Sequence, residues 1–262
     1  MTKPYGGNEQ MATMENFDHS VVSPSGTPEV PRNEVWRMFD RIAQRYDLLN
    51  RLLSFGRDVV WRKKLAHFLP EGESLQLLDL ATGTADVIIF LFQKSPRIFR
   101  AVGIDLAERM LEIGQQKIHE HQLDQVVELK VGDATQIPFP DNQFHVVTIA
   151  FGIRNVDDVP QSLREMYRVL KPGGRALILE FSLPHASIIR QAYLFYFRNI
   201  LPRIGGWISG NHYAYQYLNQ TVETFPYGES FAGLMIEAGF SRVGFKPLTF
   251  GVATIYYGDK LM

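Results

Sequence analysis

Five short apolar runs, separated by segments long enough for helices, limit the fold of this chain more than any other feature. The runs are Leu75 to Leu80, Ala101 to Ile104, Val126 to Val131, Phe144 to Ala150 and Ala176 to Phe181. Strands that alternate with helices form parallel sheets, and such strands are apolar on both faces because helices cover each side. The pattern therefore predicts an α/β fold with a doubly wound, mostly parallel sheet.

The segment before these runs divides into a tail and a helix. Residues 1–32 collect proline, glycine and serine without an apolar period, which predicts a flexible N-terminal tail. Between Asn33 and Gly56 one helical face carries the apolar residues Val35, Met38, Phe39, Ile42, Tyr46, Leu49, Leu52 and Leu53, and this spacing predicts the first helix. Residues 33–262 are accordingly expected to form a single domain.

The end of the chain predicts a hairpin. The runs Ser241 to Leu248 and Val252 to Tyr257 are close enough in sequence to pair with each other and complete the sheet. The motif "KPGG", Lys171 to Gly174, predicts a turn that leads into the fifth apolar run.

Composition excludes several classes of function. The 27 basic and 28 acidic residues give a net charge of -1, so no overall field attracts nucleic acid. The chain has no cysteine, which excludes disulfides, thiolate metal sites and a cysteine nucleophile, and its seven histidines are too scattered to predict a metal site. No secretory signal and no apolar run of about 20 residues is visible. A cytoplasmic protein is expected, with peripheral contact at the inner face of the membrane left open.

The small-residue stretch "DLATGTAD", Asp79 to Asp86, follows the first predicted strand. Doubly wound sheets bind ligands beyond the carboxyl ends of their strands, and small residues let a ligand approach the backbone. The stretch has neither the G-x-G-x-x-G dinucleotide pattern nor the glycine-lysine ending of a phosphate loop. It therefore favours a nucleoside-like ligand without a diphosphate. The alternative is a tight turn in which Thr84 caps the next helix.

Two further acidic residues follow the next two strands. Asp105 ends "VGIDL", where a carboxylate can accept both hydroxyls of a ribose. In "GDATQIPF", Asp133 can accept from an adenine amino group while Ala134 leaves room for the ring. Ribose and adenine without phosphate indicate S-adenosylmethionine, and Asp79 then either faces the methionine ammonium or supports the turn. The candidate cofactor-binding residues are Asp79, Gly83, Asp105, Asp133 and Ala134.

Longer segments resemble one known family. "YDLLNRLLSFGRDVVWRK" from Tyr46 and "RVLKPGGRALILEFS" from Arg168 are similar to the two signature segments of the menaquinone/ubiquinone biosynthesis C-methyltransferases. "FGIRNVDD", "ISGNHYAYQYL" and "FPYGESFAGLMIEAGF" also match, so the resemblance covers about residues 33 to 260. It implies a class I methyltransferase fold with an antiparallel last strand and methylation of a ring carbon of a prenylated quinol. It also implies contact of S-adenosylmethionine with Thr84, Asp105, Asp133 and Ala134.

Departures from the family pattern bear on the substrate. Asp58 stands where the first signature commonly has histidine, so no role is carried over for it. Ala85 replaces a frequent glycine, but "GTAD" and "RQAYLFYF" (Arg190 to Phe197) resemble demethylmenaquinone methyltransferases. We therefore expect the naphthoquinol demethylmenaquinol as the acceptor, with 2-polyprenyl-6-methoxy-1,4-benzoquinol of ubiquinone biosynthesis as the alternative. Two other hypotheses are a methyltransferase that acts on another lipophilic acceptor and a non-catalytic protein that binds S-adenosylmethionine.

The acceptor site is expected beyond the fourth strand, where Arg154 and Asn155 follow "AFGI". Arginine stays protonated, so Arg154 is expected to stabilise a quinolate, and the alternative is a structural ion pair. The other candidates are Asp47, His212 or a water for the proton, and Tyr46 and Tyr213 for orienting the ring.

An aromatic insertion is predicted at about residues 183–226. Residues 193–217 hold eight aromatics among 25, where the chain's 12% would give about three. Such enrichment suits a lid over an apolar acceptor, although core packing is the alternative. Arg190, Arg198 and Arg203 on this segment are placed to meet anionic lipid headgroups.

Overall fold

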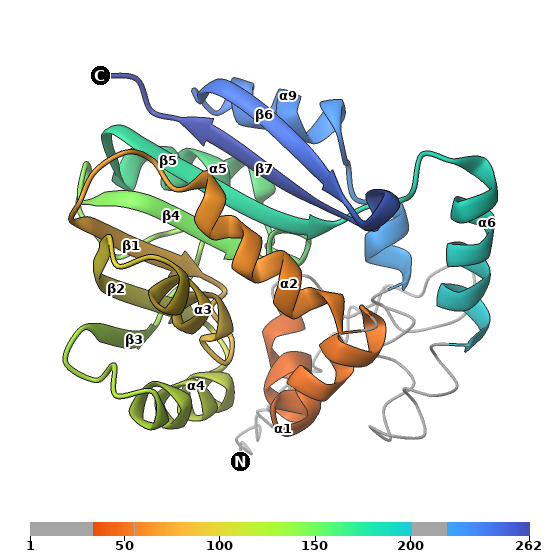
Figure 1. Cartoon of the computed structure of the whole chain (residues 1–262), viewed down its shortest axis with the longest axis horizontal. Coiled ribbons are helices and arrows are strands. Elements are labelled where there is room, and N and C mark those ends of the chain that lie inside the picture. Colours follow the sequence, from red (N-terminus) through yellow and green to blue (C-terminus); the bar gives the residue numbers. More distant parts are fainter. Residues whose placement is uncertain (1–33, 55, 201–218) are drawn as a thin grey trace, which may run out of the picture. The chain divides into compact units, whose positions relative to one another are not determined.

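The computed structural model describes residues 34–54, 56–200 and 219–262, which belong to one compact unit, Arg32–Met262. Figure 1 shows these residues as a twisted sheet with helices packed against it. The predicted tail, residues 1–32, lies outside the described residues. The first helix, α1, spans Val35–Leu53.

The sheet has seven strands in the order β3-β2-β1-β4-β5-β7-β6. Their bounds are β1 Leu75–Leu80, β2 Ile98–Asp105, β3 Val127–Val131, β4 Phe144–Ala150, β5 Leu170–Phe181, β6 Ser241–Leu248 and β7 Ala253–Asp259. Strands β1 to β5 pair in parallel, whereas β7 is antiparallel to both β5 and β6. The predicted α/β class, the parallel sheet, the C-terminal hairpin and the antiparallel last strand are confirmed.

Helices cover both faces of the sheet. The other described helices are α2 Arg57–Lys64, α3 Asp86–Lys94, α4 Glu108–Glu120, α5 Val159–Val169, α6 Ser187–Phe195 and α9 Glu229–Glu237, with short helices η2 Leu65–Phe68, η3 Ile153–Asn155, η4 Tyr196–Ile200 and η5 Thr249–Gly251. Trp61 of α2 and Ile88 of α3 pack in one core cluster with Leu77, while Leu163 of α5 packs in the other with Leu78. Alternate residues of β1 thus enter opposite cores, which explains why its sequence is apolar throughout.

One sequence prediction needs correction. Lys171–Gly174 does not form a turn before β5 but lies inside it. Leu170 pairs with Phe144 and Arg175 pairs with Val146, so four residues bulge out opposite a single one. The proline and the glycines predicted a turn ahead of the strand, whereas here they mark a bulge within it, with paired residues on either side.

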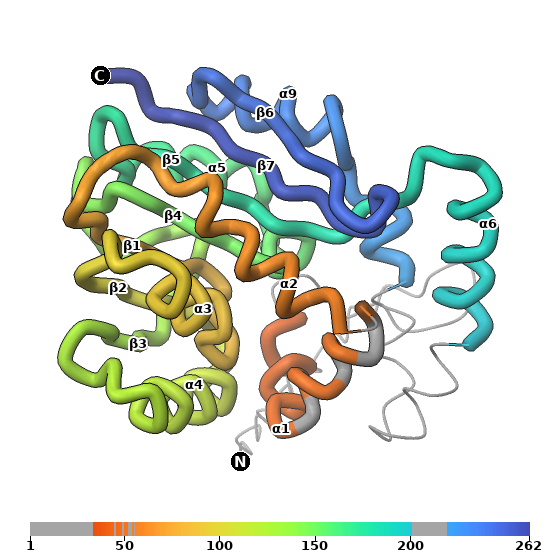
Figure 2. Tube along the Cα trace, viewed as in Figure 1, coloured from red at the N-terminus to blue at the C-terminus, as the bar shows by residue number. Residues whose placement is uncertain are grey.

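The order of the strands places a crevice at the centre of the sheet. β1 lies between β2 and β4, and the chain leaves these two neighbours in opposite directions toward β3 and β5. The loops beyond the carboxyl ends of β1 and β4 therefore separate, as at the ligand sites of doubly wound sheets. The trace in Figure 2 follows α1 through α2 into β1, and α1 packs against α4 beside the same loops.

Candidate active site

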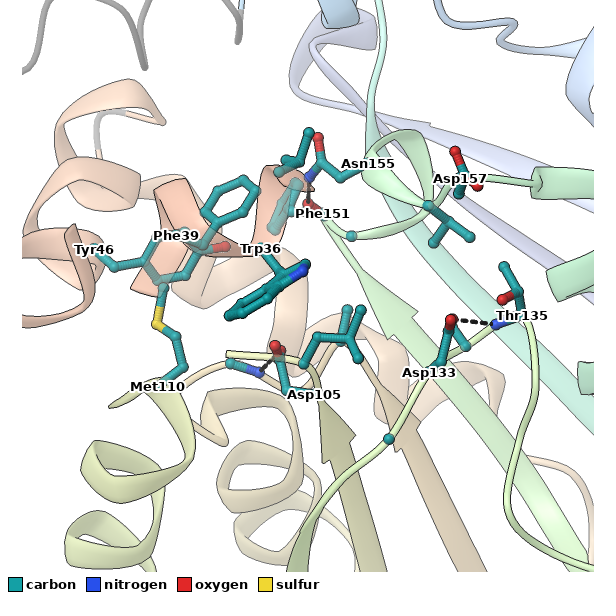
Figure 3. Close-up of a pocket in the computed structure, with 18 residues that line it drawn as sticks. Trp36, Phe39, Tyr46, Asp105, Met110, Asp133, Thr135, Phe151, Asn155 and Asp157 are labelled. Atoms are coloured by element: carbon teal, nitrogen blue, oxygen red, sulfur yellow. Dashed lines mark hydrogen bonds between the residues drawn. The ribbon is translucent and has the colours of Figure 1, made fainter. Parts of the chain in front are cut away.

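A cavity of about 190 Å³ lies in this crevice. The loops after β1, β2, β3 and β4 and the helix α1 all contribute to its lining, with Gly83, Asp105, Asp133 and Phe151 among the loop residues. Figure 3 shows the residues that line it, including Trp36, Phe39 and Tyr46 from α1. Three loops that were predicted separately to hold one cofactor therefore meet around one space.

The loop after β1 makes a tight turn with left-handed backbone at Gly83 (φ 55°) and Ala85 (φ 63°). Ala85 is the N-cap of α3 and no side chain caps this helix, so the alternative reading of Thr84 as a helix cap is wrong. The Thr84 hydroxyl instead donates to Asp47 Oδ1 at 2.8 Å. Behind the loop, a Cβ added at Gly114 of α4 would come within 3.3 Å of the Gly83 carbonyl oxygen. The glycine lets α4 pack directly against the back of the loop.

Asp105 lies at the end of β2 and lines the cavity. Its Oδ2 accepts from the Gly83 N–H at 2.8 Å, and its Oδ1 accepts from the Ala107 N–H at 2.9 Å. Burial raises the pKa of Asp105, although the backbone donors oppose this shift. Each carboxylate oxygen retains a lone pair, so this oriented group suits the two hydroxyls of a ribose.

Asp133 and Ala134 follow β3 and line the far side of the same cavity. Asp133 Oδ1 accepts from the Thr135 N–H at 2.7 Å, which fixes the carboxyl group (Figure 3). Its Oδ2 accepts from no residue in the described ranges and is free for a ligand amino group. The small side chain of Ala134 leaves space beside it for a planar ring.

Asp79 lies beneath the loop and does not line the cavity. It is 1% exposed and accepts from the hydroxyls of Thr82 at 2.7 Å and Thr148 at 2.5 Å. Burial raises the pKa of Asp79 from 3.8 to about 7. Of the two readings of this residue, its contacts favour support of the turn over contact with the methionine ammonium.

Asp47 takes part in a network that joins α1 to the loop. Its Oδ1 accepts from Thr84, and its Oδ2 accepts from Lys117 of α4 at 2.5 Å. Lys117 also donates to Thr84 at 2.9 Å and to Asp86 of α3 at 2.8 Å. Both oxygens of Asp47 and the Thr84 hydroxyl thus face each other and Lys117 rather than the cavity.

Arg154 forms a buried ion pair with Glu180, the single acidic residue of β5. Arg154 Nη1 lies 2.6 Å from Glu180 Oε1 and also donates to the Phe151 carbonyl oxygen at 2.8 Å. Arg154 Nε is shielded from solvent and has no hydrogen-bond partner among the described residues. Arg154 does not line the first cavity but a second one of about 190 Å³, together with Val159 and Phe225.

Asn155 lines the first cavity beside Phe151. Its Nδ2 lies 3.4 Å from the Phe151 carbonyl oxygen, while its Oδ1 is buried without a partner in the described part of the chain. An amide oxygen in this state is available to a ligand donor. His212 and Tyr213, the other acceptor-site candidates, lie outside the described residues, as does much of the predicted insertion at about residues 183–226.

Some residues of the site were not predicted. Trp36 lies outside the apolar face predicted for α1. That position was the one sequence signal that its side chain does not pack with the other apolar residues of the helix. Phe39 was assigned to that face, but it lines the cavity and meets the ring of Tyr46 edge to face at 5.8 Å. Glu180 was visible as the single acidic residue in the apolar run "ALILEF". A charge at that position requires a buried partner, and only the fold identifies it as Arg154.

Two negative observations apply to the described ranges. No helix there is both long enough and apolar enough to cross a bilayer. Within the same residues, histidine and acidic side chains do not gather in groups of three or more that could hold a metal ion.

Comparison with known proteins identifies the family. The model of the ubiE/COQ5 methyltransferase family matches residues 28–260. A demethylmenaquinone methyltransferase from Thermus thermophilus is 47% identical over 85% of this chain and all of its own length. A ubiquinone/menaquinone biosynthesis C-methyltransferase UbiE from Geobacter sulfurreducens is 46% identical over 85% of this chain and 87% of its own.

A solved structure supports the fold independently. The S-adenosylmethionine-dependent methyltransferase from Thermotoga maritima superposes with a TM-score of 0.60 at 20% identity, covering 86% of this chain and 99% of that one. The class I methyltransferase fold and S-adenosylmethionine as the cofactor, both expected from the sequence, are confirmed. The chain belongs to the ubiE/COQ5 methyltransferase family.

Proposed function

We propose that this protein methylates a ring carbon of demethylmenaquinol, using S-adenosylmethionine, in menaquinone biosynthesis. The observation that carries the proposal is the meeting of Asp105, Asp133 and Asn155 around one cavity, next to the buried cation of Arg154. The Thermus thermophilus relative bears the name of this activity.

The residues around the cavity suit the parts of the cofactor. Asp105 can accept from two hydroxyls and Asp133 from an amino group, while Gly83 and Ala134 keep the walls free of bulky side chains. When bound, the cofactor supplies a methyl group on a positively charged sulfur, which is an electrophile. The chain has to hold this group in line with the acceptor carbon and exclude water.

The acceptor needs negative charge on a ring oxygen. A ring carbon becomes nucleophilic when a neighbouring hydroxyl loses its proton, so the quinol must be in its reduced form. Arg154 keeps its positive charge and has an unpaired Nε–H, which suits it to stabilise the resulting oxyanion. Because both oxygens of Asp47 are already hydrogen-bonded, His212 or a water is the better candidate to accept the proton.

The naphthoquinol is favoured over the benzoquinol by sequence. Ala85 in "GTAD" matches the demethylmenaquinone methyltransferase pattern, and Ala85 adopts a left-handed backbone in this turn. The Geobacter sulfurreducens relative carries both quinones in its name, so 2-polyprenyl-6-methoxy-1,4-benzoquinol is the second candidate.

We also propose that the protein meets its prenylated acceptor at the inner face of the membrane, from the cytoplasm. Ile188 and Phe195 lie seven residues apart on α6 and are 83% and 62% exposed. Phe250 of η5 is 77% exposed, and the neighbouring Gly251 packs against Pro184, which leads into α6. We call these three side chains the apolar rim. A prenyl tail gains about 0.8 kcal/mol for each methylene that leaves water, so an apolar rim suits its transfer from the bilayer.

The backbone at Phe250 supports a role for its exposed ring. Phe250 has a φ of 59°, in the left-handed region that favours glycine. The chain thus keeps a large apolar side chain in water at a backbone position that disfavours it. Among the basic residues predicted to meet headgroups, Arg190 is exposed, Arg198 pairs with Glu223, and Arg203 lies outside the described residues.

The deciding experiment supplies the purified protein with S-adenosylmethionine labelled in the methyl group and with reduced demethylmenaquinol or the benzoquinol. Label is expected in the extracted naphthoquinone. Label only in the benzoquinone would correct the substrate, and no label in either quinone would contradict the proposed function.

A further inference from the structure

Tyr193 of α6 has a buried hydroxyl group without a partner. Its oxygen is shielded from solvent and makes no hydrogen bond to any residue in the described ranges. The ring is fixed in place, because it stacks on the fully buried ring of Phe197 at 5.2 Å with 22° between the planes. A buried hydroxyl that lacks a partner destabilises the folded protein, so its retention calls for a ligand or another reason.

Tyr193 and Arg154 border the same core cluster, which contains Phe181. Tyr193 packs against that cluster, and the guanidinium carbon of Arg154 lies 5.4 Å from the centre of the Phe181 ring. The positive charge of Arg154 lowers the pKa of Tyr193, while burial raises it by more, so the phenol keeps its proton and remains a donor. Arg154 Nε is the second buried N–H or O–H there that has no described partner. The region therefore holds one cationic donor and one neutral donor that the protein itself leaves unused.

We propose that the Tyr193 hydroxyl donates a hydrogen bond to a ring oxygen of the quinol acceptor and shares with Arg154 the stabilisation of its negative charge. This inference rests on the proposed function, because it requires an acceptor that develops an oxyanion beside Arg154. Two donors fixed before the reaction stabilise such a charge without reorganisation, which is how oxyanion sites lower a barrier. The position of Tyr193 on α6 places this donor on the same helix as Ile188 and Phe195 of the apolar rim.

Replacement of Tyr193 by phenylalanine tests whether its hydroxyl binds a ligand or has only a structural role. Tyr193→Phe removes only the unpaired hydroxyl, so the melting temperature is expected to rise by about 2 °C. Turnover of demethylmenaquinol is expected to fall by about 10-fold to 100-fold, as for loss of one oxyanion donor. The dissociation constant for S-adenosylmethionine is expected to stay within about twofold of the wild type, because Tyr193 does not line the first cavity.

Tyr256→Phe provides the matched control. The Tyr256 hydroxyl is also buried, but it accepts from the Gly228 N–H at 2.8 Å. Its removal is expected to lower the melting temperature and to leave turnover within about twofold of the wild type. A Tyr193→Phe variant with a higher melting temperature and wild-type turnover would overturn the inference.

A binding measurement tests the inference even if the proposed substrate is wrong. 1-Naphthol is a naphthalene with one phenolic oxygen, and its binding to the protein saturated with S-adenosylmethionine can be followed by its fluorescence. Tyr193→Phe is expected to weaken this binding by about fivefold to tenfold. Equal affinity in the variant and the wild type would overturn the role of Tyr193. No methylation of either quinol by the wild type would count against the proposed function.

Discussion

Arg154 and Glu180 lie 2.6 Å apart in an ion pair whose side chains are 5% and 1% exposed. Glu180 Oε1 also accepts from the Phe181 N–H at 2.8 Å, so the carboxylate is fixed to its own strand. Burial raises the pKa of Glu180, and Arg154 opposes that shift. The Glu180 carboxylate at the end of β5 therefore fixes the orientation of the Arg154 guanidinium, which comes from the loop after β4.

Breaking this pair on one side is expected to reduce both stability and turnover. Glu180→Gln leaves the buried charge of Arg154 without its counterion, which costs about 3–5 kcal/mol of unfolding free energy. The double variant Arg154→Met/Glu180→Leu removes both charges and is expected to regain most of that stability while staying inactive. Denaturant titration and turnover assays check both statements.

The pair Arg175 and Asp259 is the matched control, because it joins β5 to β7 at the same distance of 2.6 Å and Arg175 precedes Glu180 on β5 by five residues. Asp259→Asn is expected to lower stability and to leave turnover per folded molecule unchanged. Full turnover by the Arg154→Met/Glu180→Leu variant would show that the pair is only structural.

Cofactor binding and turnover are expected to separate between Asp105 and Arg154. Asp105→Ala removes the predicted ribose acceptor and also frees the Gly83 N–H, so binding of S-adenosylmethionine should fall below detection. Arg154→Ala should keep cofactor binding and lose turnover, because Arg154 does not line that cavity. Calorimetric titration with the cofactor measures the first effect, and equal affinity of the wild type and Asp105→Ala would refute the ribose role.

Asp79 is expected to make stability depend on pH. Its folded-state pKa of about 7 lies above the ordinary 3.8, so the neutral form is favoured in the folded protein. The stability that this preference provides is fully present below about pH 4 and is lost as the pH rises through about 7. Asp79→Asn stays neutral, and at about 1.4 kcal/mol for each pH unit it should be more stable than the wild type by a few kcal/mol at pH 8.

Denaturant titrations at pH 5 and pH 8 test this expectation. The difference between Asp79→Asn and the wild type should be larger at pH 8 than at pH 5. Glu71→Gln, at an exposed acidic residue before β1, should leave the unfolding free energy unchanged at both values. A constant difference for Asp79→Asn would mean that Asp79 titrates as an ordinary carboxyl group in the folded protein.

Lys117 is expected to influence cofactor affinity without touching the cofactor. Lys117→Met leaves the carboxylates of Asp47 and Asp86 without the cation between them, and their repulsion should loosen α1 from the loop. We expect cofactor affinity to fall by about tenfold and stability by about 1–3 kcal/mol. Lys94→Met, at an exposed lysine of α3, is the control. Unchanged affinity in Lys117→Met would show that α1 closes the cavity without this network.

The apolar rim is expected to bind lipid. Ile188→Glu/Phe195→Glu should reduce co-sedimentation with vesicles of phosphatidylglycerol and phosphatidylethanolamine, because charged side chains disfavour burial in the bilayer. Phe99→Glu/Val131→Glu is a matched control, since these side chains are 49% and 54% exposed on the strands β2 and β3 at the other edge of the sheet. Equal losses in both double variants would indicate a general effect of negative charge.

Much of the fold could be predicted because its strands are buried on both faces. The bounds predicted for the first and fourth runs, Leu75–Leu80 and Phe144–Ala150, are those of β1 and β4. The start of β5 could not be predicted, because the bulge at Lys171–Gly174 is held by pairing with β4, which is not local in sequence. Proline and glycine end a strand in most settings, but here pairing with β4 on both sides of the bulge keeps these residues within the strand.

The cofactor side of the site was more predictable than the acceptor side. Asp105 and Asp133 follow strands of one parallel sheet, so their meeting at one edge follows from the fold class alone. The partner of Arg154 depends on which strand neighbours β4, and no local sequence pattern predicts that strand order. Asp79 was left between two readings because a residue at the end of a strand can point above the sheet or beneath the loop.

The close packing of α4 behind the cofactor loop has a consequence for mutational scans. Gly114 and Lys117 lie one helical turn apart, the first against the Gly83 carbonyl oxygen and the second bonded to Thr84. Neither residue lines the cavity, yet a change at either one is expected to alter the loop that we propose holds the cofactor. A scan scored by activity would therefore group these two positions with the ligand contacts, and their place in the packing behind the loop explains that grouping.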